Sequence, residues 1–123
     1  MSAEHLELAQ RFLDALAVAA KTGDRNGVYP LLAPDVEWVT PKRELRGTDE
    51  VRDELSWVSP PDNLDVEFDR PELADLGGGR VATNVHETYR MKVSGDFAYS
   101  RDRRIELTIR DGTVARYEMR VIG

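Results

Sequence analysis

The apolar residues of this 123-residue chain change their spacing near Asn63, and this change restricts the class of fold more than any other feature. Before Asn63, between Leu6 and Ala20, apolar residues recur at the period of an amphipathic helix. After Asn63 they alternate with polar residues, which is the period of a strand with one buried face. Helices that precede strands in this way predict an α+β fold.

Three helices are predicted in the first part of the chain. The first ends at Gly23, a residue type typical of helix C-termini. A second, short helix is expected over about Asp24 to Leu32, although Pro30 within it is tolerated only in a first turn or at a kink. The third begins at Thr48, which can cap its N-terminus, and the prolines at 60–61 close it.

A buried carboxylate is predicted in the strand over residues 81–93. Glu87 falls on the same face as the apolar side chains of that strand, which are Val81, Val85, Tyr89, Met91 and Val93. Burying an unpaired carboxylate is costly, so Glu87 needs a partner. If residues 94–96 form a three-residue turn, Glu87 lies directly opposite Arg103 in the next strand. The sequence therefore predicts an inward Glu87–Arg103 pair in an otherwise apolar wall.

The last two strands are expected over residues 97–110 and 113–122. The length of the turn between them follows from the requirement that the apolar side chains of both strands lie on the same face. A two-residue turn would place Leu107 opposite Arg116 and mix the faces. A three-residue loop with Gly112 in the left-handed bulge position instead places Leu107 opposite Ala115, and we expect this loop. Three inward rows would follow: Val85-Ile105-Tyr117, Glu87-Arg103-Met119 and Tyr89-Arg101-Val121.

Composition favours one cytoplasmic domain over residues 1–123. The chain has no apolar run of the ~20 residues that a membrane span needs, and its first residues do not resemble a secretory signal. Its net charge of -6 argues against nucleic-acid binding, which relies on clustered cations. There are no cysteines, and the two histidines, His5 and His86, show no metal-ligand spacing. We therefore expect no metal site and no cofactor.

The whole chain resembles the nuclear transport factor 2-like superfamily, which includes the SnoaL-like polyketide cyclases, ketosteroid isomerases and limonene-epoxide hydrolases. The resemblance lies in the order and spacing of four segments: Phe12–Leu16, Leu31–Trp38, Leu45–Val51 and Leu107–Val114. It implies a curved, mixed but mostly antiparallel sheet that wraps around the N-terminal helices as a cone. It also implies a pocket between the concave face of the sheet and the helices, often in a homodimer.

The catalytic residues of these relatives are mostly absent. Where ketosteroid isomerases place a general-base Asp, a Tyr donor and a protonated Asp, this chain has Thr40, an apolar residue near Leu16, and Ile105. Of five roles in the epoxide hydrolases, one acid remains, at Glu87. The positions of the other four hold Met119, Val85, Trp38 and Thr40.

Two classes of function therefore remain open. One is an isomerase, cyclase or hydrolase that acts on a small apolar or polycyclic molecule, with Glu87 and Arg103 as the catalytic pair. The other, which the sequence favours, is a binding module in which this pair orients one polar group of a small apolar ligand or is only structural. The polar outer face of the sheet is expected to form a homodimer. The expected ligand contacts are Trp38, Thr40, Trp57, Phe68, Tyr89, Arg101, Tyr117 and Met119.

Overall fold

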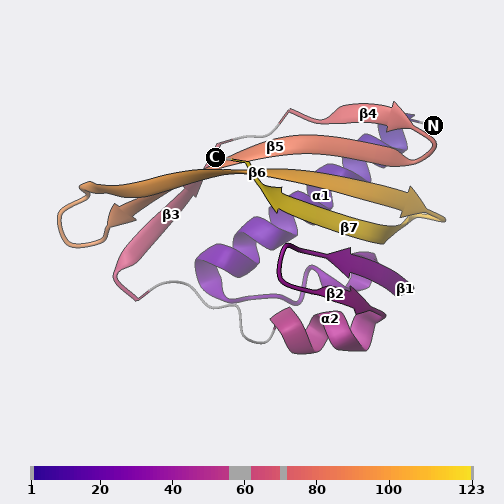
Figure 1. Cartoon of the computed structure of the whole chain (residues 1–123), viewed down its shortest axis with the longest axis horizontal. Coiled ribbons are helices and arrows are strands. Elements are labelled where there is room, and N and C mark those ends of the chain that lie inside the picture. Colours follow the sequence, from indigo (N-terminus) through magenta and orange to yellow (C-terminus); the bar gives the residue numbers. More distant parts are fainter. Residues whose placement is uncertain (1, 56–61, 70–71, 123) are drawn as a thin grey trace.

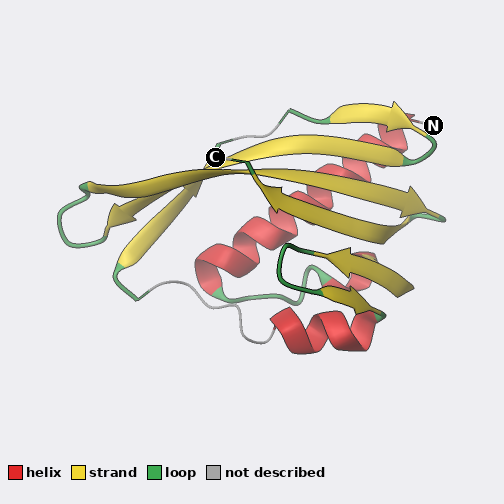
Figure 2. Cartoon of the chain, viewed as in Figure 1, coloured by secondary structure: helices red, strands yellow, loops and turns green. Residues whose placement is uncertain are grey.

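The computed structural model describes residues 2–55, 62–69 and 72–122. Within these residues, a curved seven-stranded sheet is accompanied by helix α1 (Ser2–Thr22) and helix α2 (Thr48–Leu55) (Figures 1 and 2). Helix α1 lies against one face of the sheet, and α2 lies beside the edge formed by the first strands (Figure 1). The expected α+β cone is confirmed.

The seven strands form one mixed sheet in the order β2-β1-β7-β6-β5-β3, with β4 also paired to β5. Strands β1 and β7 are parallel, and the other pairs are antiparallel. The strands are β1 (Leu32–Val39), β2 (Glu44–Arg46), β3 (Leu64–Phe68), β4 (Ala74–Gly77), β5 (Arg80–Met91), β6 (Phe97–Arg110) and β7 (Thr113–Val121).

The hydrophobic core lies between α1 and the sheet. Ala9 and Phe12 are fully buried on α1, as the helical periodicity predicts. The helix ends where Gly23 adopts a φ of 81° and donates its N–H to the carbonyl of Ala19 at 2.9 Å. From α2, Val51 and Leu55 pack into the same core, and the hydroxyl of Thr48 donates to the carbonyl of Ala33 at 3.1 Å.

The predicted helix over Asp24 to Leu32 is wrong. Only a 3-10 helix forms there, over Tyr29–Leu31, and Leu32 already begins β1. Pro30 occupies its first turn, where the missing N–H is tolerated but a longer helix is not favoured. The predicted end of α2 at the prolines of 60–61 lies outside the described residues.

The register between β5 and β6 differs from the prediction by two residues. Glu87 lies opposite Arg101, and Arg103 lies opposite Val85. The connection is longer than the three-residue turn at 94–96, because Met91 already closes the hairpin by donating its N–H to the carbonyl of Asp96 at 2.8 Å. A shift of two residues keeps the side chains between Arg80 and Tyr89 on their predicted faces, since the pleat has a period of two, and a bulge follows between Tyr89 and Arg90.

The turn between β6 and β7 is also different from the prediction. Arg110 pairs with Thr113 across a two-residue turn, in which Asp111 and Gly112 have φ values of 54° and 74°. A bulge between Thr108 and Ile109 then restores the parity of the faces. The three-residue loop and the three predicted rows are therefore wrong. The observed rows include Val81-Leu107-Tyr117 and Thr83-Ile105-Met119.

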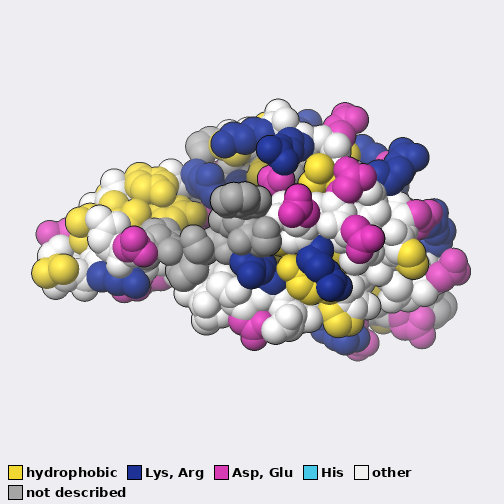
Figure 3. Space-filling view, turned by 90° about the horizontal axis from the view of Figure 1, so that it is seen from below, with side chains coloured by type: hydrophobic (Ala, Val, Ile, Leu, Met, Phe, Trp, Pro, Cys, Tyr) yellow, Lys and Arg dark blue, Asp and Glu magenta, His cyan; other side chains and the backbone are white. Residues whose placement is uncertain are grey.

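The hairpin of β5 and β6 extends beyond the end of α1 (Figure 1). Hydrophobic side chains gather on this protruding end of the molecule (Figure 3). Val93 is 99% exposed and Phe97 is 59% exposed. The sheet therefore presents apolar side chains to solvent where the helix no longer covers it.

Candidate functional site

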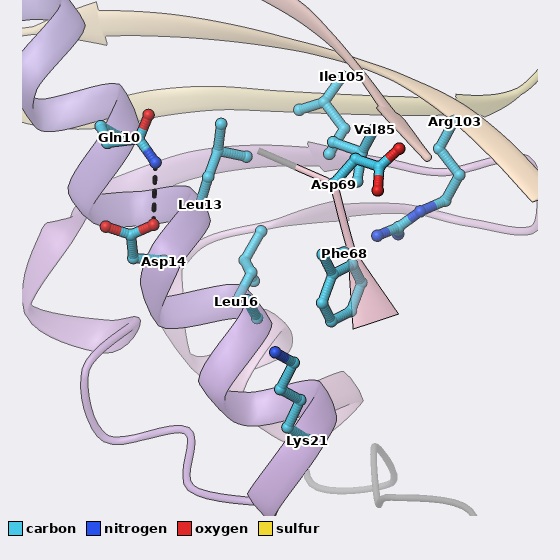
Figure 4. Close-up of a pocket in the computed structure, with 11 residues that line it drawn as sticks. Gln10, Leu13, Asp14, Leu16, Lys21, Phe68, Asp69, Val85, Arg103 and Ile105 are labelled. Atoms are coloured by element: carbon cyan, nitrogen blue, oxygen red, sulfur yellow. Dashed lines mark hydrogen bonds between the residues drawn. The ribbon is translucent and has the colours of Figure 1, made fainter. Parts of the chain in front are cut away.

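A cavity of about 350 Å³ lies between α1 and the strands β3, β5 and β6 (Figure 4). This volume is at the lower end of the ~300–1,000 Å³ that is typical of small-molecule sites. The cavity is lined by Gln10, Leu13, Asp14, Leu16, Ala17, Lys21, Phe68, Asp69, Val85, Arg103 and Ile105.

The cavity has an apolar middle and polar ends. Leu13 and Leu16 of α1 face Phe68, Val85 and Ile105 of the sheet across its middle (Figure 4). The helical side of the cavity also carries a polar pair, in which the amide of Gln10 donates to the carboxylate of Asp14 at 2.9 Å. Asp69 and Arg103 lie on the sheet side, and Lys21 lies near the end of the helix (Figure 4). The Lys21 ammonium is 5.6 Å from the centroid of the Phe68 ring.

Glu87 is buried behind the cavity and is held by three side chains. Only 1% of its surface is exposed. Its Oε2 accepts a hydrogen bond from the hydroxyl of Tyr89 at 2.6 Å and another from Nε of Arg101 at 3.2 Å. Its Oε1 forms an ion pair with Nε of Arg103. Glu87 is not among the residues that line the cavity, whereas its partner Arg103 is.

The phenol of Tyr89 stays protonated near neutral pH, so it acts as a hydrogen-bond donor in this cluster. Burial, followed by the hydrogen bond to Glu87 and the negative charge of Glu87, raises the pKa of Tyr89 to about 12. The Tyr89 ring stacks on Tyr99, with centroids 4.4 Å apart. The guanidinium of Arg101 lies 5.9 Å from the Tyr89 centroid. Burial is the largest influence on the pKa of Arg101 and lowers it, but the charges of Glu87 and Tyr89 and the hydrogen bonds to both residues together raise it more, so the net shift is upward.

Arg103 connects the buried cluster with the cavity. Its side chain is 19% exposed and lines the cavity wall next to Val85 and Ile105. Its charge also acts on Tyr117, where burial raises the pKa of the phenol and the positive charge of Arg103 opposes that rise. The structure thus places one guanidinium between Glu87, Tyr117 and the cavity.

The predicted ligand contacts fall into different parts of the molecule. Trp38 and Tyr117 are in the core, where their rings stack with centroids 4.0 Å apart, and neither lines the cavity. Met119 is half-buried and packs against the same core. Thr40 lies just after β1, where its N–H donates to the carbonyl of Arg43 at 2.9 Å.

The other predicted contacts surround the cavity or lie behind it. Phe68 lines the cavity, together with Arg103 of the predicted pair. Tyr89 and Arg101 belong to the Glu87 cluster. Trp57 lies outside the described residues.

Four polar residues of the cavity were not predicted. Three of them are spaced along α1 at Gln10, Asp14 and Lys21, and the fourth is Asp69, directly after β3. Positions that are four and seven residues apart share one side of a helix, so a polar stripe beside the apolar stripe was a readable signal. Asp69 gave no comparable signal, since it continues the ordinary alternation of β3.

Other kinds of site find little support among the described residues. They contain no group of three His, Asp or Glu side chains that could hold a metal ion. Neither described helix combines the length and the apolar composition that crossing a lipid bilayer requires. His86 lies on the opposite face of β5 from Glu87, and its Nδ1 is 2.6 Å from Oδ1 of Asp102.

Comparisons with known proteins agree with this architecture. The family model of the SnoaL-like domain matches residues 9–119. None of the curated proteins matches the chain by sequence. An NTF2-like protein from Anabaena variabilis has a similar structure, with a TM-score of 0.79, 12% identity, and coverage of 98% of this chain and 90% of that one.

Two further solved structures are similar. An NTF2-like protein from Burkholderia xenovorans has a TM-score of 0.70 and 22% identity, over 97% of this chain and 89% of that one. An LEH-like epoxide hydrolase from M. tuberculosis has a TM-score of 0.71 and 15% identity, over 98% and 84%. At these identities the structural likeness concerns the fold alone. The family match covers most of the chain, so the chain belongs to the SnoaL-like domain family, and its fold is that of the nuclear transport factor 2-like proteins.

Proposed function

We propose that this protein binds a small, mainly apolar molecule in the cavity between α1 and the sheet. The proposal rests on one observation: among the described residues that line this mainly apolar cavity there is one guanidinium, that of Arg103, and the fully buried Glu87 holds it in the wall. A mostly apolar hollow with a few fixed polar groups is the usual composition of a small-molecule site. The cavity wall would bind the body of the ligand, and Arg103 would orient its polar group.

The position of Glu87 supports binding over acid/base catalysis by that residue. Both of its oxygens are engaged by Tyr89, Arg101 and Arg103, and it does not reach the cavity. A general base must lie within hydrogen-bond reach of the proton it removes, or one water away. Glu87 would therefore have to leave its partners before it could act on a ligand.

The alternative is an isomerase, cyclase or hydrolase whose carboxylate comes from another residue. One observation favours it: Asp14 and Asp69 line the cavity from opposite sides, together with Arg103 (Figure 4). A carboxylate and a guanidinium in one apolar cavity can serve as a base and as the partner of a developing negative charge. In this case the ligand would be a substrate.

A cavity-filling substitution tests binding at this place. Ala17 lines the cavity, whereas Val18, the next residue on α1, is 46% exposed and does not. We expect that compounds found by thermal shift on the wild type bind Ala17→Phe much more weakly and bind Val18→Phe normally. A compound at ~100 times its Kd should stabilise the wild type by about 2.7 kcal/mol. Equal binding to the two variants would place the site elsewhere.

The same compounds distinguish a binding protein from an enzyme. Each hit is incubated with the wild type and followed by mass spectrometry and chiral chromatography. Turnover that is lost in Asp14→Asn or Asp69→Asn, with the Kd unchanged, would establish the enzyme. An unchanged compound that remains bound supports the binding protein.

A further inference from the structure

The Glu87 cluster holds one positive charge in excess. Two guanidiniums, of Arg101 and Arg103, share the single carboxylate of Glu87. Tyr89 adds no negative charge near neutral pH, because its pKa is raised to about 12. Among the described residues, Glu87 is the one acid that forms an ion pair with Arg103. The cluster is therefore cationic, and its charges are partly removed from water.

Of the two guanidiniums that carry this excess charge, that of Arg103 lies in the cavity wall. Arg101 has 43% of its side chain exposed and does not line the cavity, so water can solvate it. Arg103 is only 19% exposed and is one of the residues that line the cavity. A cation in an apolar wall with little water around it is stabilised by an anion that binds close to it. The Lys21 ammonium adds a second positive charge near the end of the helix (Figure 4).

The two acids of the cavity wall, Asp14 and Asp69, are placed less effectively than Glu87 to neutralise the charge of Arg103. Asp69 lies at the same end, but it is exposed, and no ion pair joins it to Arg103 in the described part of the chain. Asp14 is exposed too, lies across the cavity on α1, and is engaged by the amide of Gln10 at 2.9 Å. Exposed carboxylates are well solvated, so they interact weakly with a cation several ångströms away.

We propose that the ligand of this cavity is an apolar monoanion, namely a small hydrophobic carboxylic acid in its ionised form, whose carboxylate pairs with Arg103. This proposal rests on the proposed binding function and specifies its ligand class. The apolar body of the acid lies between Leu13, Leu16 and Phe68. The carboxylate becomes the second counter-ion of the arginine cluster, in the planar geometry that guanidinium and carboxylate groups share.

The test compares three ligands of one shape and different charge. Cinnamate, cinnamamide and cinnamylamine are titrated near neutral pH by calorimetry, and octanoate, octanamide and octylamine are titrated as a second, flexible series. The acids should bind about tenfold more tightly than the amides, or better, because a charged partner strengthens the hydrogen bonds of Arg103. The amines should bind most weakly. This comparison needs no variant, so it does not depend on whether a variant folds.

Two matched variants then show which arginine causes the preference for the acid over the amide. Arg103→Gln should bind the acid and the amide of each series within about twofold of one another, since the guanidinium is lost. Arg101→Gln removes the same charge from the cluster but leaves the Arg103 guanidinium in the cavity wall, so the preference for the acid should weaken without being lost. Circular dichroism and urea unfolding confirm that each variant is folded before it is titrated.

The outcomes separate this inference from the binding function on which it rests. If the amides or amines bind as tightly as the acids, and Ala17→Phe abolishes that binding, the cavity is a binding site but the ligand class is wrong. If Arg101→Gln removes the preference and Arg103→Gln keeps it, the assignment to Arg103 is wrong. If no member of either series binds at millimolar concentration, the inference is overturned, while the wider thermal-shift screen still decides the binding function.

Discussion

Arg103 forms an ion pair with Glu87 although the two residues are not opposite one another in the sheet. The ladder pairs Glu87 with Arg101 and Arg103 with Val85. Arg103 reaches the carboxylate diagonally, on the same face of the sheet, over a distance that long side chains can span. The diagonal contact leaves Glu87 with two arginine partners and Arg103 with a surface toward the cavity.

This arrangement predicts unequal effects of removing the two partners. Glu87→Gln leaves two guanidiniums without their carboxylate and should destabilise the protein by about 3–5 kcal/mol. Arg103→Met leaves Glu87 still bonded to Arg101 and Tyr89, so it should cost less, about 1–3 kcal/mol. Urea unfolding measures both. Equal losses, with an additive double variant, would show that the groups are not coupled.

Trp38 is expected to act through the core and not through the ligand. It is 4% exposed and stacks on Tyr117, with Phe12 packed edge-on at a centroid distance of 6.1 Å. Trp38→Ala should destabilise the fold by about 3–5 kcal/mol. The exposed Phe97 is the control, and Phe97→Ala should change stability by less than about 1 kcal/mol. A folded Trp38→Ala protein with selectively lost ligand binding would contradict this view.

Two neighbouring glycines provide a test of the turn before β5. Gly78 and Gly79 both have a positive φ, of 63° and 80°. A Cβ on Gly78 meets nothing within 4 Å, whereas a Cβ on Gly79 would overlap the carbonyl oxygen of Ile109. Gly78→Ala should therefore cost about 1–2 kcal/mol from backbone strain alone. Gly79→Ala should cost at least about 1–3 kcal/mol more, since the backbone of β6 must also move. Thermal unfolding of the two variants should rank them in this order.

His86 should titrate above its ordinary range. The hydrogen bond with Asp102 raises the pKa of His86, burial opposes this, and the charges of Asp102 and Asp69 add to the rise. Because the pKa is higher in the folded state, the stabilisation by this pair is complete below the unfolded pKa of ~6.5 and is lost as the pH rises through the folded pKa. An NMR titration of the imidazole checks the pKa directly. Asp102→Asn should lower it, and an unchanged value would refute the pairing.

A homodimer through the outer face of the sheet stays a prediction. That face carries exposed ion pairs, such as Arg116 with Glu37 at 2.5 Å, and polar pairs of this kind can face either water or a second copy. Light scattering decides whether the protein is a dimer. If it is, Arg104→Glu on the outer face should dissociate it, whereas Val93→Asp at the exposed hairpin tip should not. The opposite result would place the interface on the hairpin.

The alternation of side chains was sufficient to predict which face each long strand buries. Glu87 is inward and fully buried as expected, and β6 spans residues 97–110 as the sequence indicates. Helix α1 also ends where Gly23 predicts. These features depend on the spacing of neighbouring residues and on local backbone preferences, which are present in the sequence itself.

Register and the position of the cavity were decided only by the tertiary structure. A shift of two residues leaves every face unchanged, so parity could not distinguish Arg101 from Arg103 as the residue opposite Glu87. The bulge near Ile109 likewise restored a parity that the short turn alone would have broken. The cavity depends on which side chains fill the concave face. Trp38 and Tyr117 stack on one another and close one part of it, and α1 leaves a space beside Arg103 because packing between distant segments sets the distance from helix to sheet.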